Sequence, residues 1–179
     1  MKDLHIRNAT PEDALEIAQI HVKTWQCAYR GQIPDSYLDS LSIVERSAKW
    51  KEQLTHPQSG LHASVAELDG TIIGWCTFGV NTDVDAAKEW GELHALYIDS
   101  EYIGKGVGSQ LMDEVVRTLR KDGYTKATLW VLDTNQNTRR FYERRGWKIE
   151  GGVKDEPKAD FFLHEIRYIR DLNAMAEPQ

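Results

Sequence analysis

The sequence predicts an α/β domain with a mixed, mostly antiparallel sheet of about seven strands, a central parallel pair and flanking helices. The main observation is a strand, helix and strand in succession: an apolar strand over 93–98, a helix ending near Lys121, and the continuous apolar run 127–132. Two strands joined through a helix run parallel, with a right-handed crossover. A second observation is Asp69-Gly70 between two strand-like runs, which predicts an antiparallel hairpin.

Length and charge limit the classes of protein to consider. The chain has 179 residues with 41% hydrophobic content, which predicts one domain over 1–172 followed by a mobile tail over 173–179. A formal charge of −6 argues against a nucleic-acid partner, because such proteins carry a basic face. The sequence shows neither an apolar run of membrane-spanning length nor the features of a signal peptide. We therefore expect no membrane partner and a cytoplasmic location.

The N-terminal part predicts one strand followed by helices. A hydroxyl at Thr10 and a proline at the next position are typical of a helix start, and Ser42 with Glu45 forms a second capping pattern. The predicted elements are a strand at His5–Arg7, a helix from Thr10 to about Ala28, a short helix at Asp35–Leu41, and a third helix that begins at Ser42 and ends before Pro57.

Four ring-bearing residues fall in this helical segment. His21 and Trp25 share one face of the first predicted helix, Tyr29 follows one turn later, and Tyr37 lies in the second helix. Aromatic residues at helical spacing usually pack in a core. Packing is therefore the expected role of any one of them, although the cluster as a whole is more suggestive of a function.

The remaining strands are predicted from alternation and turn residues. Leu61–Leu68 and Thr71–Gly79 flank the Asp69-Gly70 turn, and Asn81–Lys88 is polar and predicts a loop. At the other end of the chain, Trp147–Val153 and Phe161–Ile169 predict a closing antiparallel pair joined by a polar connection at Lys154–Asp160.

A glycine cluster follows the central strand. Gly104, Gly106 and Gly108 alternate with Lys105 and Val107 and lead into the predicted helix. The first amides of a helix lack intrahelical partners and lie at the positive end of its dipole, so such a turn can bind an anion. The alternative is a tight turn without a ligand.

Two known phosphate-binding glycine motifs do not fit the cluster. A nucleotide-binding P-loop needs Ser or Thr after the lysine, whereas Gly106 follows Lys105. A dinucleotide fingerprint needs Gly or Ala where Ser109 stands. Ile103–Gly108 instead resembles the acyl-CoA pyrophosphate loop of the GNAT (GCN5-related) N-acetyltransferases, in which Arg or Gln is followed by two residues, Gly, one residue, and Gly or Ala. Ile103 departs from the Arg or Gln of that pattern.

A second stretch, TNQNTRRFYERRGW after Asp133, resembles another GNAT signature. That signature has Asn, a small residue three positions later, Phe-Tyr-Glu, then Gly and an aromatic. The matching positions are Asn135, Thr138, Phe141, Tyr142, Glu143, Gly146 and Trp147. Both motifs occur in register, and the predicted order of elements is similar to the GNAT fold over about 165 residues.

The resemblance implies acetyl-CoA as cosubstrate, bound in a cleft where the parallel strands diverge, and no metal. The positions it assigns to acetyl-CoA binding are Leu96, Tyr97, Ile98, Ile103, Gly104, Lys105, Gly106, Val107, Gly108, Ser109, Asn135, Thr138, Arg139 and Tyr142. It makes Glu92 the candidate base, His94 the second candidate, and Tyr142 the candidate acid. It makes His21, Trp25, Tyr29 and Tyr37 candidates for the acceptor site. The structural alternatives are a solvated carboxylate at Glu92 and an aromatic that closes the helix at Tyr142.

The function implied by the resemblance is transfer of an acetyl group to an amine by direct attack in a ternary complex. The acceptor would be a small-molecule or peptide amine, and a homodimer is possible. The alternative is a sensor or regulatory module that binds acyl-CoA without turnover, which the departure at Ile103 keeps open. Release of free CoA thiol distinguishes the two.

Overall fold

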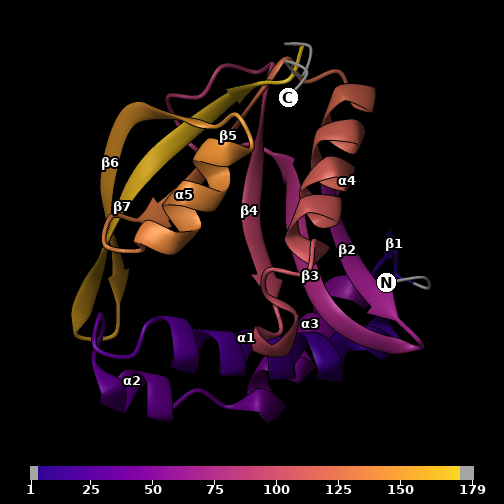
Figure 1. The fold of residues 1–179 in the computed structure, drawn as a ribbon, viewed down its shortest axis with the longest axis vertical. Coiled ribbons are helices and arrows are strands. Elements are labelled where there is room, and N and C mark those ends of the chain that lie inside the picture. The colour runs from indigo at the N-terminus through magenta and orange to yellow at the C-terminus, as the bar shows by residue number, and fades with distance from the viewer. Residues whose placement is uncertain (1–3, 174–179) are drawn as a thin grey trace. The chain divides into compact units, whose positions relative to one another are not determined.

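The protein is described by a computed structural model that covers residues 4–173 (Figure 1). Its strands are β1 (Leu4–Asn8), β2 (Leu61–Leu68), β3 (Thr71–Val80), β4 (Trp90–Ile98), β5 (Lys126–Leu132), β6 (Lys148–Lys158) and β7 (Phe161–Asp171). Its helices are α1 (Ala14–Ala28), α2 (Asp35–Asp39), α3 (Ile43–Thr55), α4 (Val107–Lys121) and α5 (Gln136–Arg144), with single 3-10 turns at Pro11–Asp13 and Ser100–Tyr102. No helix within 4–173 is long and apolar enough to cross a membrane.

The strands form one seven-stranded sheet in the order β1-β2-β3-β4-β5-β7-β6. β4 and β5 are parallel, and their register runs from Trp90 opposite Lys126 to Leu93 opposite Leu129. β5 pairs with β7, and β7 with β6, in antiparallel fashion. The predicted fold class, including its central parallel pair, is therefore confirmed.

The hairpin between β2 and β3 has the backbone that its sequence requires. Asp69 has φ 50° and Gly70 has φ 79°, and a two-residue turn with both central φ angles positive matches the twist of the flanking strands. Asp-Gly is favoured there because aspartate tolerates this conformation and glycine has no Cβ to oppose it.

The chain divides into two compact units. The first combines the segment up to Phe78 with Ala95–Glu114, and the second combines Gly79–His94 with the chain from Val115 onward. Both β4 and α4 contribute residues to each unit. The single domain expected over 1–172 stays a prediction. Of the expected tail, the positions 174–179 lie outside the described residues.

In the first unit, α1 and α3 pack on each other and on the strands β2 and β3. Ser42 caps α3 by accepting a hydrogen bond from the Glu45 amide at 3.2 Å, as its sequence predicted. Trp50 of α3 meets Trp75 of β3 edge to face, with ring centroids 4.8 Å apart. The buried residues of this core are Ala14, Ile17, Ala18, Ile20, Trp50, Val65, Ile72 and Trp75.

In the second unit, β5 supplies a continuous apolar strand, as predicted. Ala127, Leu129 and Val131 are all buried. β4 passes α4 at Gly91, where a Cβ would lie 2.8 Å from a methyl carbon of Leu119. That contact is too short for any side chain, so Gly91 is needed for α4 to pack closely against β4.

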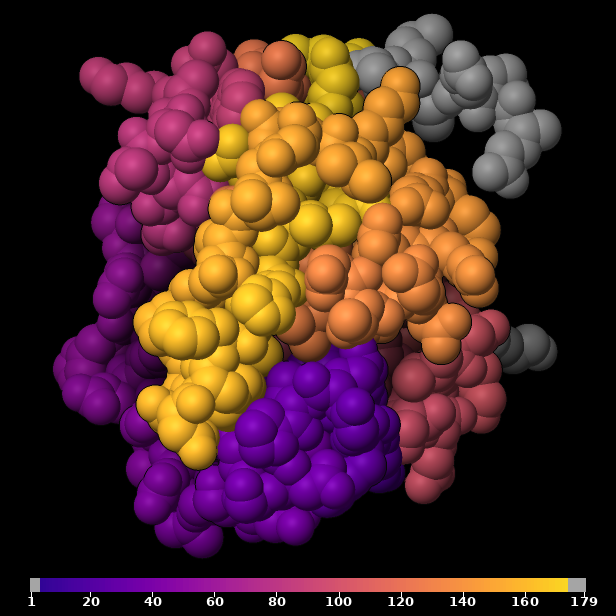
Figure 2. Space-filling model, turned by 90° about the vertical axis from the view of Figure 1, so that its left-hand side faces the viewer, coloured from indigo at the N-terminus to yellow at the C-terminus, as the bar shows by residue number. Residues whose placement is uncertain are grey.

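The predicted end of β6 is wrong. Lys154–Asp160 was expected to be a polar connection, whereas β6 continues to Lys158 and pairs with β7. β6 is the edge strand, so its side chains can be polar while its backbone still bonds to β7, and Pro157 is tolerated at an edge. The strands β6 and β7, orange to yellow, form part of the surface seen in Figure 2.

Candidate active site

The backbone of the glycine loop after β4 has open space beside it. Asp99 accepts a hydrogen bond from the Glu101 amide at 3.0 Å and starts the 3-10 turn that leads to Gly104. Gly104 has φ 79° and Gly106 has φ 87°, and a Cβ at either position would meet nothing within 4 Å. α4 begins directly afterwards at Val107. The loop therefore has the space that a pyrophosphate requires, and it lies at the start of a helix, where the dipole favours an anion.

Two neighbouring side chains set the character of this loop. Ile103 is 65% exposed, so it presents an apolar side chain where the family pattern has Arg or Gln. Lys105 places its Nζ 4.9 Å from the centre of the Tyr102 ring. Lys105 is thus the cation that the loop itself supplies. Gly108 differs from the other two glycines, because it lies within α4.

Glu92 is a buried carboxylate on β4, only 5% exposed. Its Oε2 accepts hydrogen bonds from the amide and the hydroxyl of Thr82, both at 2.9 Å, and its Oε1 lies 3.4 Å from His94 Nδ1. Burial raises the pKa of this carboxyl, but His94 and Thr82 together outweigh burial and bring the pKa below its usual value. Glu92 is therefore ionised at neutral pH, which excludes the expected alternative of a solvated carboxylate.

His94 lies between two acceptors. Its Nε2 is 3.1 Å from the Val80 carbonyl oxygen, and its Nδ1 faces Glu92. A neutral imidazole has one N–H and can donate to only one of them, whereas the imidazolium donates to both. Glu92 and His94 are thus neighbours on β4, and Glu92 is one of the two acceptors within reach of the His94 ring.

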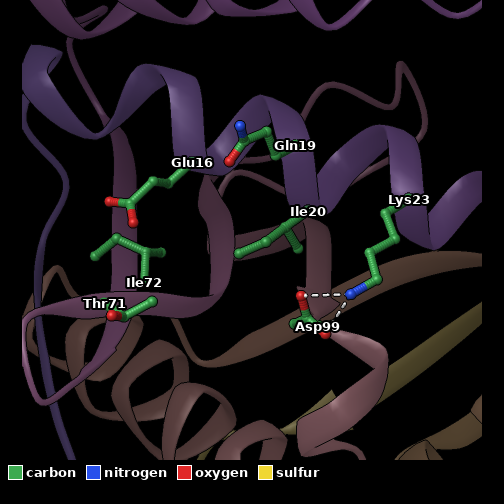
Figure 3. Close-up of a pocket in the computed structure, with 7 residues that line it drawn as sticks. All are labelled: Glu16, Gln19, Ile20, Lys23, Thr71, Ile72 and Asp99. Carbon is green, nitrogen blue, oxygen red and sulfur yellow. Dashed lines mark hydrogen bonds and ion pairs between the residues drawn. The ribbon is translucent and has the colours of Figure 1, made fainter.

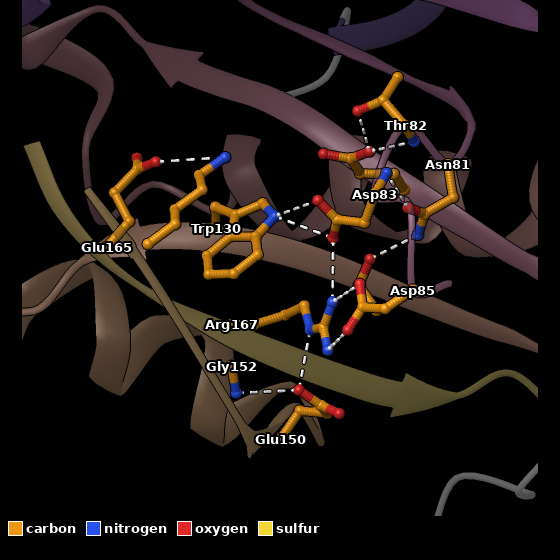
Figure 4. Close-up of polar contacts among 12 residues, drawn as sticks. Asn81, Thr82, Asp83, Asp85, Trp130, Glu150, Gly152, Glu165 and Arg167 are labelled. Carbon is orange, nitrogen blue, oxygen red and sulfur yellow. Dashed lines mark hydrogen bonds and ion pairs between the residues drawn. The ribbon is translucent and has the colours of Figure 1, made fainter. Parts of the chain in front are cut away.

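The segment that carries Thr82 is held by Arg167, a buried residue of β7 (Figure 4). Arg167 donates to both carboxylate oxygens of Asp85 at 2.7 and 2.8 Å, to Glu150 at 2.8 Å and to Asp83 at 3.3 Å. Because Asp83 directly follows Thr82, these bonds fix the backbone that donates to Glu92.

The candidate acceptor residues come together in the first unit. The Trp25 ring lies 5.1 Å from Tyr29 and 6.3 Å from Tyr37, measured between centroids, and His21 lies 5.7 Å away. Trp25 also donates from its Nε1 to the Tyr97 hydroxyl at 2.9 Å. Tyr29 and Tyr37 are half-buried, whereas His21 and Trp25 are buried. The two tyrosines are therefore the accessible part of this group.

His21 is a buried titratable residue with an apolar environment. Its ring stacks on Tyr97 at 5.3 Å, and neither ring nitrogen has a hydrogen-bond partner among the described residues. Burial lowers the pKa of His21 to about 3, and the charge of Arg46 adds to the effect. His21 is thus neutral in the native state.

This predicts a stability effect in acid. In the unfolded chain His21 titrates near 6.5, so the unfolded state binds a proton that the native state does not. The free energy of unfolding should fall as the pH falls from about 6.5 toward about 3. His21→Phe should lose less stability than the wild type between about pH 7 and about pH 4, measured by urea unfolding. His62→Phe, which replaces a histidine stacked on Phe78, is the control. Wild-type and His21→Phe curves that run parallel would contradict this account.

The second motif forms the start and core face of α5. Asn135 caps the helix by accepting from the Thr138 amide at 3.3 Å. Arg139 donates to the Tyr168 hydroxyl at 3.1 Å and to the Asp133 carbonyl at 2.7 Å. Tyr142 is 6% exposed, and its ring packs 6.2 Å from that of Trp147. Its ring packing fits the structural alternative as well as a chemical role, so a test must remove the hydroxyl alone.

One cavity lies away from all these residues. It has a volume of about 330 Å³ and is lined by α1, the start of β3 and Asp99 (Figure 3). Lys23 and Asp99 form an ion pair across it at 3.1 Å. It contains none of the site residues that the sequence predicted. Within 4–173, no three His, Cys, Asp or Glu side chains gather as metal ligands would.

The comparisons with known proteins decide the family. Residues 16–147 match the family described as Acetyltransferase (GNAT) family. The chain belongs to this family. An uncharacterized N-acetyltransferase of Bacillus subtilis is 31% identical over 130 residues, which cover 73% of this chain and 72% of the relative. These matches confirm the family that the two motifs indicated.

Two similar proteins come from Thermoplasma acidophilum. A spermidine N(1)-acetyltransferase is 28% identical over 166 residues, covering 90% of this chain and 96% of the relative. A crystal structure of the PaiA N-acetyltransferase with coenzyme A superposes with a TM-score of 0.76 at 23% identity, covering 94% of this chain and 99% of that one. The second likeness shows that the GNAT fold extends over nearly the whole chain.

The roles that the resemblance assigns to the glycine loop, Glu92, His94 and the α5 residues stay predictions, and nothing in the sequence indicated Arg167, Asp83 and Asp85. The aspartates lie in a loop that the sequence marks only as polar, and they are more than 80 positions from Arg167. β7 also carries His164, Glu165 and Arg170, so its sequence did not distinguish Arg167 from other charged residues.

Proposed function

We propose that this GNAT protein transfers the acetyl group of acetyl-CoA to an amine. The observation that carries the proposal is the glycine loop, in which Gly104 and Gly106 hold left-handed backbone conformations with open space beside them at the start of α4. Positive φ and open space also occur at the ordinary turn glycine Gly70, so the distinguishing feature of Gly104 and Gly106 is their place directly before α4, where the helix dipole favours an anion.

In this proposal, residues of the first unit bind the pyrophosphate and the pantetheine of acetyl-CoA. The loop at Gly104, Gly106 and Gly108 holds the pyrophosphate and Lys105 adds charge, while Ile103 reduces affinity relative to an Arg or Gln. The backbone of Leu96 to Ile98 pairs with the pantetheine amides, which extends β4 in the way that strands pair. In the second unit, Asn135, Thr138 and Arg139 support the cofactor at the start of α5.

Acetyl-CoA supplies an acyl group activated as a thioester, and an amine attacks it only when neutral. The Glu92 and His94 pair accepts the proton that the amine loses, either directly or through water. Tyr142 donates a proton to the departing sulfur. Glu92 is the candidate base and His94 the second candidate, and the lowered pKa of Glu92 keeps its carboxylate ionised and able to accept the proton.

The acceptor lies against Tyr29 and Tyr37, with His21 and Trp25 behind them. The aromatic faces offer favourable contacts to a cationic or aliphatic amine. Because one similar protein is named as a spermidine N(1)-acetyltransferase, spermidine belongs in any panel of acceptors. The alternative function, an acyl-CoA sensor, would keep the CoA site without turnover.

Binding of the cosubstrate has a direct test in the glycine loop. Acetyl-CoA at a hundredfold excess over its Kd should stabilise the protein by about 2.7 kcal/mol and raise its Tm by a few degrees. Gly106→Asp should abolish the rise, because a carboxylate there meets the pyrophosphate. Gly106→Ala, which adds the same backbone strain without charge, should keep part of it. A folded Gly106→Asp variant with an unchanged Tm shift would refute the assignment of this loop.

A further inference from the structure

Trp130 of β5 carries two cations over its indole ring. Lys154 places its Nζ 4.4 Å from the ring centre, and the Arg167 guanidinium carbon lies 5.4 Å away. The indole Nε1 donates to both carboxylate oxygens of Asp83, at 3.1 and 3.0 Å, which fixes the orientation of the ring (Figure 4). The ring is thus a preformed platform for a positive charge.

Glu165 completes this platform with a carboxylate. It is the cross-strand partner of Lys154, and its Oε2 lies 3.5 Å from the Lys154 Nζ. An aromatic face beside a carboxylate is an arrangement that suits an alkylammonium group, because one part supplies the cation–π attraction and the other the opposite charge. The ammonium that occupies it in this structure belongs to the chain itself.

The two cations on the ring differ in how firmly they are held. Arg167 is buried and is bound by three carboxylates, those of Asp83, Asp85 and Glu150. The Lys154 side chain is 35% exposed, extends from the edge strand β6, and has a single carboxylate within ion-pair distance among the described residues. Rotation of Lys154 into solvent loses one ion pair and the contact with the ring, whereas removal of Arg167 would break its bonds to three carboxylates.

If Lys154 moved away, the Glu165 carboxylate would lose its ion-pair partner. The Glu165 side chain is only 17% exposed, so its ionised form is poorly hydrated. Burial raises the pKa of Glu165, and the charge of Lys154 acts in the opposite direction. A ligand ammonium would restore the lost interaction, and the carboxylates around Arg167 favour a positive rather than a negative ligand.

We propose that the Trp130 ring and the Glu165 carboxylate form an ammonium subsite that holds Lys154 in the free protein and the charged end of a small aliphatic diamine or polyamine in the complex. The inference rests on the proposed function, because it concerns the acceptor of that reaction. In such an acceptor the nitrogen to be acetylated must be neutral, whereas a second nitrogen keeps its charge and needs a binding partner of this kind.

The test compares 1,4-diaminobutane with butylamine, using isothermal calorimetry without acetyl-CoA. Glu165→Gln keeps the shape of the side chain and removes its charge, so it should weaken diaminobutane binding roughly tenfold. It should change butylamine binding little. Lys154→Ala removes the internal competitor and should tighten diaminobutane binding several-fold, because the subsite is then vacant in every molecule. Lys148→Ala, which removes an exposed lysine at the other end of the same strand, is the matched control and should leave both affinities unchanged.

The Tm of each variant shows whether it is folded. Diaminobutane binding that is equal in folded Glu165→Gln and wild type, or that weakens in Lys154→Ala, would overturn the subsite. These results are independent of acetyl transfer. If the protein binds diaminobutane through Glu165 but never transfers an acetyl group, the subsite is supported and the proposed function is wrong. If it transfers acetyl groups with equal KM for both amines in all variants, the proposed function is supported and the subsite is wrong.

Discussion

Tyr142→Phe should slow single-turnover acetyl transfer by roughly 10²- to 10⁴-fold, the range for loss of a positioned general acid. The substitution removes one oxygen atom and keeps the ring that packs against Trp147 and Tyr168 at 6.2 and 6.5 Å. The helix and its core face should therefore survive. Affinity for acetyl-CoA should change far less, because the lost interaction acts mainly in the transition state.

The measurement must be made by rapid mixing of excess enzyme with acetyl-CoA and amine, since slow product release would hide a change in the chemical step. Phe141→Leu is the matched control, because Phe141 is the half-buried neighbour on the same helix and has no hydroxyl. If folded Tyr142→Phe transfers acetyl at the wild-type rate, Tyr142 is a packing residue and water or another group protonates the sulfur.

Arg167→Met should destabilise the protein by roughly 3 kcal/mol, the scale for breaking a buried ion pair by removing one partner. The change leaves three carboxylates without their cation, of which Asp83 is the most buried, with 15% of its side chain exposed. Arg140→Met on the exposed side of α5 removes the same charge and should cost less than about 0.5 kcal/mol. Urea unfolding of both variants measures the difference.

The same variant should also alter the pH dependence of catalysis. Without Arg167 the loop that presents Thr82 is released, and Glu92 loses donors that favour its ionised form. The pKa of Glu92 should then rise toward or above its usual value, because burial is no longer opposed. In the wild type, the lowered pKa means that ionised Glu92 stabilises the fold at neutral pH, and this stability is lost as the pH falls through the folded pKa. Because the pKa of Glu92 should be higher in Arg167→Met, the acidic limb of the rate profile should move to higher pH in that variant. An unmoved limb would show that the loop does not position Glu92.

Local sequence signals predicted most of the fold. Three features act through a few neighbouring residues, so the local sequence suffices to predict them. They are the Asp69-Gly70 turn, the Ser42 cap of α3 and Gly106 before α4. The extension of β6 over Lys154–Lys158 could not be found in that way. Its polar residues form a strand only because β7 offers backbone partners, and that partnership belongs to the tertiary structure.

The candidate site also contains features that local sequence predicts and features that depend on the tertiary structure. The glycine loop was predicted from a family motif and Glu92 from the family's arrangement of the central strand, and both roles stay predictions. The bond from Thr82 to Glu92 joins residues 10 positions apart, and the bonds from Arg167 to the aspartates cross more than 80 positions. Nothing in the local sequence distinguishes those aspartates from solvated loop residues, since their partner arrives only when β7 joins the sheet.

Acetyl transfer itself is the most direct test of the central claim. The protein, acetyl-CoA and a panel of amines that includes spermidine, 1,4-diaminobutane, amino acids and peptide N-termini would be incubated, with free CoA thiol measured over time and the products identified by mass spectrometry. The account predicts that at least one amine gains a single acetyl group, with one CoA released per product, and that Gly106→Asp abolishes the reaction. Tight binding of acetyl-CoA with no acetylated product from any amine would contradict it and would favour the sensor.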